Sequence, residues 1–333
     1  MLGGVMKKLL SLCLVLGFCA GAFAEDVKVG CYIHSRFSAG KAENDSFAIK
    51  RARVKFTGNL DERFSFQLLA ETAVTPLLLD AYMECKMSDA LKIKTGQFKI
   101  PLSAEALASA TKQDLINKYQ FISQMLPSTC RDIGVMASGE FPENKISYSA
   151  GVFNGSGPNA ADNDGNSFYV ARLTAKPLAK IKAGVGFAGS HETVSGDSKI
   201  ETALIATPGF ASYEKQIAQA DLEFKQGGIS LKAEYIAGNY SPDDSTIKGV
   251  NAAGFGVTGS YFVISKKLQA SARYEKYDPD DSVTDKKDVT WTTLGLNYFP
   301  AGKVKLQANY ISKKEAKNEV DNDTLIVQLQ YCF

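Results

Sequence analysis

The end of the chain alternates strictly between two kinds of side chain. One side of the pattern is apolar or aromatic and comprises Leu325, Val327, Leu329, Tyr331 and Phe333. The other side is mostly polar and comprises Thr324, Ile326, Gln328, Gln330 and Cys332. Successive side chains of a β-strand point to opposite faces, so the pattern predicts a strand with one apolar and one polar face. Such a strand, ending on an aromatic residue, is typical of a barrel with lipid outside and water inside.

The same alternation recurs in the segments that precede this one. Three segments show it clearly. The residues expected on the outer face are Val304, Leu306, Ala308 and Tyr310 in the first, Leu268, Ala270, Ala272 and Tyr274 in the second, and Ile229, Leu231, Ala233 and Tyr235 in the third. About sixteen segments of roughly eight to twelve residues follow this pattern. We therefore predict an all-β fold, a transmembrane antiparallel up-and-down β-barrel of about 16 strands. A soluble antiparallel sandwich fits each strand alone, but the unbroken run of strands and the terminal Phe333 favour the barrel.

Short and long connections alternate between these predicted strands. Most of the short turns contain the Gly, Pro, Asn or Asp residues that tight hairpins need. The predicted turns are residues 58–61, 87–89, 141–144, 176–178, 226–228, 263–266 and 299–302. The predicted longer connections include residues 154–166, 190–212, 237–249, 277–287 and 311–323. This alternation is typical of a barrel with short periplasmic turns and longer external loops.

One connection, from Pro101 to Cys130, is long and has a composition of its own. Its stretch from Ala104 to Met125 is rich in helix formers and poor in turn residues. A barrel of about sixteen strands is wide enough to hold water, so a loop folded inward would narrow it to a selective aperture. We expect a partly helical third external loop, residues 101–131, that constricts the pore. An external helical lid without a filtering role is the alternative.

The first residues predict export. Lys7 and Lys8 precede an apolar run from Leu9 to Phe18, and the small residues Ala22 and Ala24 suit a signal peptidase. We therefore expect a cleaved signal peptide over residues 1–24 and one outer-membrane barrel domain over residues 25–333. Cys19 is a poor lipidation site because a bulky Phe18 precedes it. No later stretch is long and apolar enough for a transmembrane helix.

Charge and cysteine content narrow the classes of function. The chain has 38 Lys and Arg against 36 Asp and Glu, and the two counts become equal once Lys7 and Lys8 are removed. That balance argues against nucleic acid as a partner. Four cysteines follow the signal, namely Cys31, Cys85, Cys130 and Cys332. Cys31 and Cys332 fall on opposite predicted faces and none of the four has a zinc-site spacing, so we expect free thiols, no metal and no cofactor.

Three stretches of the first half carry a family likeness. They are Gly96 to Glu105 at the start of the long loop, Arg131 to Val135 where it returns, and Gly151 to Gly155 at the end of the next hairpin. Together with Arg51-Ala52-Arg53, they resemble the phosphate-selective porin family, the O and P type porins. The likeness is strongest over about residues 45–175 and fades afterwards into general barrel pattern.

The resemblance implies a homotrimer of sixteen-stranded barrels, each with a water-filled pore constricted by its third external loop. It also implies anion selectivity that comes from Arg and Lys side chains along the lumen and in that loop. In this chain the loop region offers Lys112, Lys118 and Arg131, opposed by Glu105 and Asp114.

Basic residues of inward phase are concentrated early in the chain. Arg51, Arg53 and Lys55 line up about 7 Å apart on one face of the second predicted strand, forming a ladder. Further inward basic candidates are Arg36, Arg172, Lys182 and Arg273. The inward acidic residues are Glu71, Asp80, Glu84, Asp132, Asp221, Glu223, Glu234 and Glu275. Either the ladder faces the constriction and gives a weak anion preference, or its charges pair with acidic neighbours and rigidify the wall.

These patterns predict an outer-membrane porin, a passive diffusion channel for small hydrophilic solutes with a weak preference for anions, and the family resemblance implies that phosphate is one of these anions. Expected partners are small hydrophilic or anionic solutes, outer-membrane lipid, and the barrel-assembly machinery, which would act through Phe333. A surface adhesin or antigen with an incidental pore is the alternative. We do not expect an enzyme, because only His34 and His191 could serve as bases and neither has a suitable nucleophile in a recognisable pattern.

Overall fold

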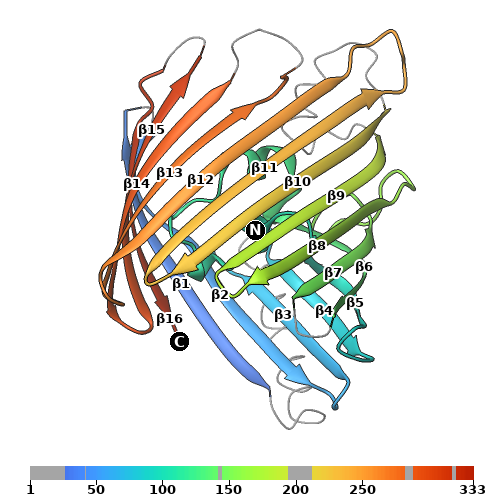
Figure 1. Ribbon diagram of the computed structural model, residues 1–333, viewed down its shortest axis with the longest axis horizontal. Coiled ribbons are helices and arrows are strands. Elements are labelled where there is room, and N and C mark those ends of the chain that lie inside the picture. Colours follow the sequence, from blue (N-terminus) through green and yellow to red (C-terminus); the bar gives the residue numbers. More distant parts are fainter. Residues whose placement is uncertain (1–26, 42, 142–144, 194–211, 282–287, 317–319) are drawn as a thin grey trace, which may run out of the picture.

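The computed structural model describes residues 27–41, 43–141, 145–193, 212–281, 288–316 and 320–333. The predicted signal peptide lies outside these residues. The described strands form one closed antiparallel barrel in which each strand pairs with its neighbours in sequence, and β1 pairs with β16 (Figure 1). This confirms the predicted sixteen-stranded fold.

The strands of the first half are β1 (Lys28–Gly40), β2 (Glu43–Asn59), β3 (Phe64–Glu71), β4 (Leu78–Lys86), β5 (Lys92–Lys99), β6 (Arg131–Glu140), β7 (Ile146–Phe153) and β8 (Phe168–Leu178). Those of the second half are β9 (Ile181–Thr193), β10 (Ser212–Gln226), β11 (Ile229–Pro242), β12 (Val250–Ile264), β13 (Leu268–Asp278), β14 (Val289–Ala301), β15 (Val304–Glu315) and β16 (Thr324–Cys332). The predicted turn at residues 176–178 is instead the end of β8, and the turn itself lies at residues 179–180.

The two faces of each strand follow the alternation in the sequence. On β16, Leu329 and Tyr331 are 47% and 46% exposed on the outside, whereas Gln328 and Gln330 are buried inside. Apolar side chains face hydrocarbon at no cost, while a charge at mid-membrane costs about 2 to 4 kcal/mol for Lys or Arg. That difference fixes which face turns outward.

The barrel closes between its first and last strands. Cys31 and Phe333 exchange two backbone hydrogen bonds of 2.8 and 2.9 Å, which places the terminal aromatic residue inside the ladder. Tyr32 is the register partner of Cys332, so Cys31 and Cys332 belong to opposite faces. All four cysteines of the described chain are free.

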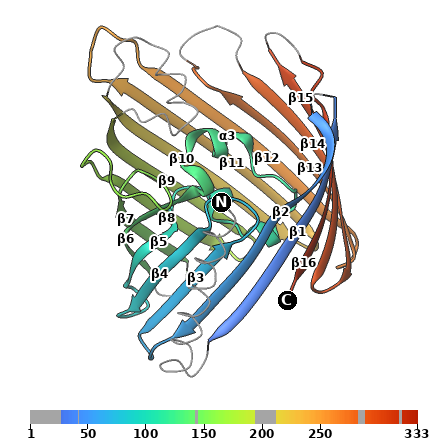
Figure 2. The same ribbon diagram turned by 180° about the vertical axis from the view of Figure 1, so that it is seen from behind.

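The long connection of residues 100–130, called the inner loop from here on, lies inside the barrel (Figure 2). It contains the short helices α2 (Ala104–Leu107), η1 (Ala110–Lys112), α3 (Gln120–Met125) and η2 (Ser128–Cys130). The helix formers therefore make short separate turns instead of one helix, because each turn is held by different wall residues. No helix in the described residues is long and apolar enough to cross a membrane.

Candidate functional site

Inward-facing glycines of the wall form sockets for the inner loop. A methyl group added to Gly254 would lie 2.4 Å from Phe121, and one on Gly256 would lie 2.3 Å from Tyr119. The loop therefore approaches the backbone of β12 so closely that only glycine, which has no side chain, fits at these two positions. Gly295 on β14 receives Leu115 in the same way, at 2.4 Å. The inner loop therefore packs directly against the backbone of the wall at these three glycines.

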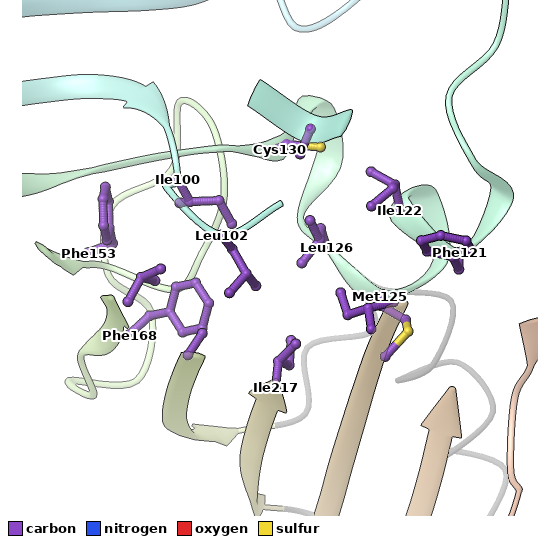
Figure 3. Close-up of a cluster of buried hydrophobic side chains, with 14 of the residues drawn as sticks. Ile100, Leu102, Phe121, Ile122, Met125, Leu126, Cys130, Phe153, Phe168 and Ile217 are labelled. Carbon is purple, nitrogen blue, oxygen red and sulfur yellow. The ribbon is translucent and has the colours of Figure 1, made fainter. Parts of the chain in front are cut away.

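An apolar cluster fills the space between α3 and the wall. Phe121, Ile122, Met125 and Leu126 of the inner loop pack with buried residues of β5 to β12 (Figure 3). The wall side of this cluster includes Phe98, Phe153, Phe168, Val170, Ala188, Ile217, Ile236 and Ala252. Burying each such loop side chain contributes about 1.5 to 3 kcal/mol. The inner loop is thus part of the folded core, which contradicts the alternative of an external lid.

One buried ion pair and two hydrogen bonds fix α2 and the nearby Leu102 to the wall. Arg273 on β13 donates to Glu105 Oε1 at 3.0 Å, and its guanidinium lies 4.0 Å from the centre of the Tyr119 ring. Glu234 on β11 accepts the backbone N–H of Glu105 at 3.0 Å. Arg172 on β8 donates to the carbonyl oxygen of Leu102 at 2.7 Å. Charges buried in this way are stable only because each one has a partner.

A segment of the inner loop, residues 106–113, crosses the bore and is called the strap. At one end Lys99 Nζ on β5 donates to the carbonyl oxygens of Ala106, Leu107 and Ala108 at 2.8 to 3.0 Å. At the other end Lys305 Nζ on β15 donates to the carbonyl oxygens of Thr111 and Gln113 at 3.2 and 3.0 Å. Between β15 and β5 the barrel order runs through β16, β1, β2, β3 and β4. The strap and those five strands therefore enclose one side of the lumen.

The wall facing the strap carries the predicted basic ladder. Arg36 and Arg51 are half-buried and Lys55 is exposed. Arg51 Nη1 lies 3.2 Å from His34 Nδ1, and Arg36 donates to Gln328. In the described chain none of these three basic groups has a carboxylate within ion-pair distance. Arg53 differs, because it pairs with Glu71 at 2.8 Å and donates to the Tyr32 hydroxyl group.

The other predicted basic residues divide into paired and unpaired groups. Arg131 donates to both oxygens of Asp80, and Arg172 pairs with Asp221 at 2.5 Å, so both are buried with a carboxylate, as is Arg273. Lys118 donates to the Ala106 carbonyl oxygen and supports the strap. Lys112 is exposed on the strap, and Lys182 is half-buried on β9. Sequence reasoning missed Lys99 and Lys305, whose partners are backbone oxygens that no residue pattern reveals.

Two histidines were the only candidate bases. His34 is fully buried beside Arg51. His191, at the end of β9, lies 2.9 Å from Asp243. In the part of the chain that the structure describes, neither imidazole makes a hydrogen bond to a hydroxyl group, so no pair of nucleophile and base is formed there.

Comparisons with known proteins agree with this architecture. The family model of phosphate-selective porins O and P matches residues 28–333. An uncharacterised protein of Aquifex aeolicus (strain VF5) is 24% identical over 321 residues, 85% of this chain and 76% of that protein.

Two solved structures show the same fold at low identity. The trimer form of OmpT from Vibrio cholerae has a TM-score of 0.70 and 14% identity, over 92% of this chain and 99% of that chain. The anion-selective porin from Comamonas acidovorans has a TM-score of 0.69 and 11% identity, over the same shares of the two chains. The chain therefore belongs to the phosphate-selective porin O and P family and is a channel of the outer membrane.

Proposed function

We propose that this channel passes small hydrophilic solutes by passive diffusion, with a weak preference for anions that includes phosphate. Solutes pass between the strap and the wall made by β16 and β1 to β4. The strap, residues 106–113, is the constriction. Most of its residues are small, namely Ala106, Ala108, Ser109, Ala110 and Thr111, so it narrows the bore without closing it.

One observation carries the anion preference. In the described residues, the partly exposed basic groups without a carboxylate partner include Arg36, Arg51 and Lys55 on the wall and Lys112 on the strap. The inward carboxylates Asp132, Glu234 and Glu275 are instead buried and accept backbone N–H groups. Fixed charge of one sign at a narrow point of low dielectric raises the local concentration of counter-ions. The balance at the aperture is therefore positive although the whole chain is nearly neutral.

Phosphate is a reasonable member of the permeant set. Guanidinium groups offer planar pairs of N–H donors that match phosphate oxygens, and Arg36 and Arg51 lie on adjacent strands. The family description names phosphate, and a structurally similar porin is described as anion-selective. The test is competition, because phosphate that binds in the aperture lowers the chloride conductance of a single channel.

Charge selectivity is tested by reversal potentials in planar bilayers across a potassium chloride gradient. We expect anion preference for the wild-type channel. In each of the single variants Arg36→Ala and Arg51→Ala, the reversal potential should shift towards cation preference. Lys267→Ala is the matched control, since it removes the same charge from an exposed turn after β12. Cation preference in the wild type, or equal shifts in the control, would refute the proposed selectivity.

Assembly and targeting belong to the same proposal. We propose a homotrimer, in line with the trimer form of the similar OmpT structure, and its test is the mass of the unheated protein in detergent. Phe333, 53% exposed on the outer face, is the proposed signal to the barrel-assembly machinery, and its deletion should reduce membrane insertion. An adhesin role of the external loops stays a prediction, since residues 194–211 and 282–287 lie outside the described chain.

A further inference from the structure

A row of four amide side chains crosses the inner wall between Arg36 and Asp114. Arg36 on β1 is the register partner of Gln328 on β16, and Gln328 is the partner of Gln307 on β15. The row continues with Asn297 on β14 and Gln269 on β13, each the register partner of the residue before it. These four residues, Gln328, Gln307, Asn297 and Gln269, are called the amide row. Inward side chains of register partners are close enough to hydrogen-bond.

The side-chain hydrogen bonds along the row all point the same way, and Asn297 Nδ2 donates in addition to the backbone carbonyl oxygen of Asp114 at 2.6 Å. Arg36 Nε and Nη2 donate to Gln328 Oε1 at 3.3 and 3.1 Å, and Gln328 Nε2 donates to Gln307 Oε1 at 3.3 Å. Gln307 Nε2 donates to Asn297 Oδ1 at 2.9 Å, and Asn297 Nδ2 donates to Gln269 Oε1 at 2.8 Å. Gln269 Nε2 donates to Asp114 Oδ1 at 3.1 Å. The chain of donors runs without a break from the guanidinium to the carboxylate.

The chemistry of the two ends fixes that direction. Arginine can only donate hydrogen bonds and an ionised carboxylate can only accept them, while an amide does both from opposite ends. An amide turned the other way would place its NH₂ group against the guanidinium of Arg36, or its oxygen against Asp114. One orientation of all four amides therefore satisfies both ends.

Burial makes the orientation costly to break. The four amides are at most 6% exposed, so a buried group that loses its partner costs about 1 to 3 kcal/mol. Aligned hydrogen bonds in a low-dielectric interior also polarise one another, so each hydrogen bond in the row is stronger than it would be alone. Lys232 Nζ on β11, 2.5 Å from Asp114 Oδ2, keeps the carboxylate in place.

Arg36 needs such an anchor. It has no carboxylate partner among the described residues, and Arg51 on the neighbouring strand repels it. A long side chain without a fixed acceptor would sample several rotamers and spread its charge through the lumen. Two hydrogen bonds to Gln328 Oε1 hold the guanidinium against the wall. Asp114 directly follows the strap, so the same row joins the position of Arg36 to that of the constriction.

We propose that the amide row is a positioning device that sets charge selectivity at a distance, with Gln307 and Asn297 as positioning residues that touch no solute. The row holds the Arg36 guanidinium at the aperture in a fixed relation to the strap. This inference rests on the proposed anion preference. By this inference, uncharged residues as well as charged ones determine the charge selectivity of the channel.

The test is a double-mutant cycle between Gln307 and Arg36, which do not touch. Gln307→Met keeps the side-chain volume but removes both the acceptor for Gln328 and the donor to Asn297. Reversal potentials and the free energy of unfolding in detergent are measured for wild type, Gln307→Met, Arg36→Ala and the double variant. Ser271→Ala is the matched control, because this buried inward hydroxyl on β13 bonds Ser260 and lies outside the row.

We expect Gln307→Met to lose anion preference in the same direction as Arg36→Ala, and to cause no further loss once Arg36 is absent. Ser271→Ala should leave the reversal potential unchanged. Where Arg36→Ala does shift the reversal potential, an effect of Gln307→Met that is absent, or equally large without Arg36, would overturn the inference.

The failure of the proposed function would look different. If Arg36→Ala itself leaves selectivity unchanged, the proposed role of Arg36 in anion preference is refuted. The double-mutant cycle of unfolding free energies then tests whether the amide row couples Gln307 to Arg36. Coupling between the two distant residues supports the row in that case, and additive free energies refute it.

Discussion

The ring of Tyr119 lies so close to the α-carbon of Gly256 that an added methyl group would be 2.3 Å from its Cε1 atom. Tyr119 also donates to or accepts from the Thr258 hydroxyl group at 2.9 Å and lies against Arg273. The contact joins β12 to the inner loop shortly after the strap. The position of the inner loop therefore depends on the absence of a side chain at this point of the wall.

Gly256→Ala should push Tyr119 and the inner loop away from β12. Forcing a methyl group into a packed interior costs about 1 to 3 kcal/mol, so we expect a lower free energy of unfolding and an altered, noisier single-channel conductance. Gly259→Ala on the same strand is the control, since its nearest atom would be Leu231 Cδ2 at an ordinary 3.5 Å. A variant at Gly256 with unchanged conductance and stability would contradict this role.

Glu105→Gln should destabilise the protein much more than loss of a surface charge. The change removes the carboxylate that pairs at 3.0 Å with the Arg273 guanidinium, which is 4% exposed, and breaking a buried pair typically costs about 3 to 5 kcal/mol. Denaturant unfolding in detergent measures the loss. Asp89→Asn, which removes the exposed pair with Lys86, is the comparison and should change little. Similar effects of the two substitutions would show that the buried pair does not hold α2.

Sequence pattern predicted the barrel because lipid and water impose a period of two on every strand. The faces of β11, β13, β15 and β16 follow directly from alternating residues. The inner loop was recognisable by its length and helix formers. These features are local, so they leave a trace in neighbouring residues.

Pairing of charges could not be predicted, because it depends on register. Arg53 is the register partner of Glu71 on β3, whereas β3 ends at Glu71, so Arg51 has no partner on β3 and lies opposite His34 on β1. Sequence left both interpretations of the ladder open. The structure pairs Arg53 with Glu71, and a role of Arg51 in selectivity stays a prediction. The contact between Tyr119 and Gly256 joins residues far apart in the chain, and no periodic pattern in the sequence indicates it.

Asp243 should make one external contact sensitive to acid. Hydrogen bonds from the Ser212 hydroxyl group and from His191 hold the pKa of the Asp243 carboxyl below its ordinary value of 3.8. A lowered pKa contributes stability that is present above the ordinary value and is lost as pH falls through the lowered one. The contact between the start of β10 and residues 243–249 should therefore loosen only below the ordinary value.

The measurement is the emission of a fluorophore attached to Ser245→Cys during a titration from neutral to strongly acidic pH. The change should be confined to the acidic end. In a background of Asp243→Asn, which has no carboxyl to protonate, the acidic transition should disappear. A transition that persists there would assign the acid response to other groups.

Arg51 and Arg53 should differ in their effect on selectivity although they lie two residues apart. Arg51→Gln removes a charge that has no carboxylate within ion-pair distance in the described chain, so the reversal potential should shift towards cations. The double change Arg53→Gln with Glu71→Gln removes a charge pair joined at 2.8 Å and leaves the net lumen charge unaltered. It should leave the reversal potential nearly unchanged, with a cost that appears in stability instead. A larger shift in the double variant than in Arg51→Gln would mean that the paired groups, and not the unpaired ones, face the permeating ions.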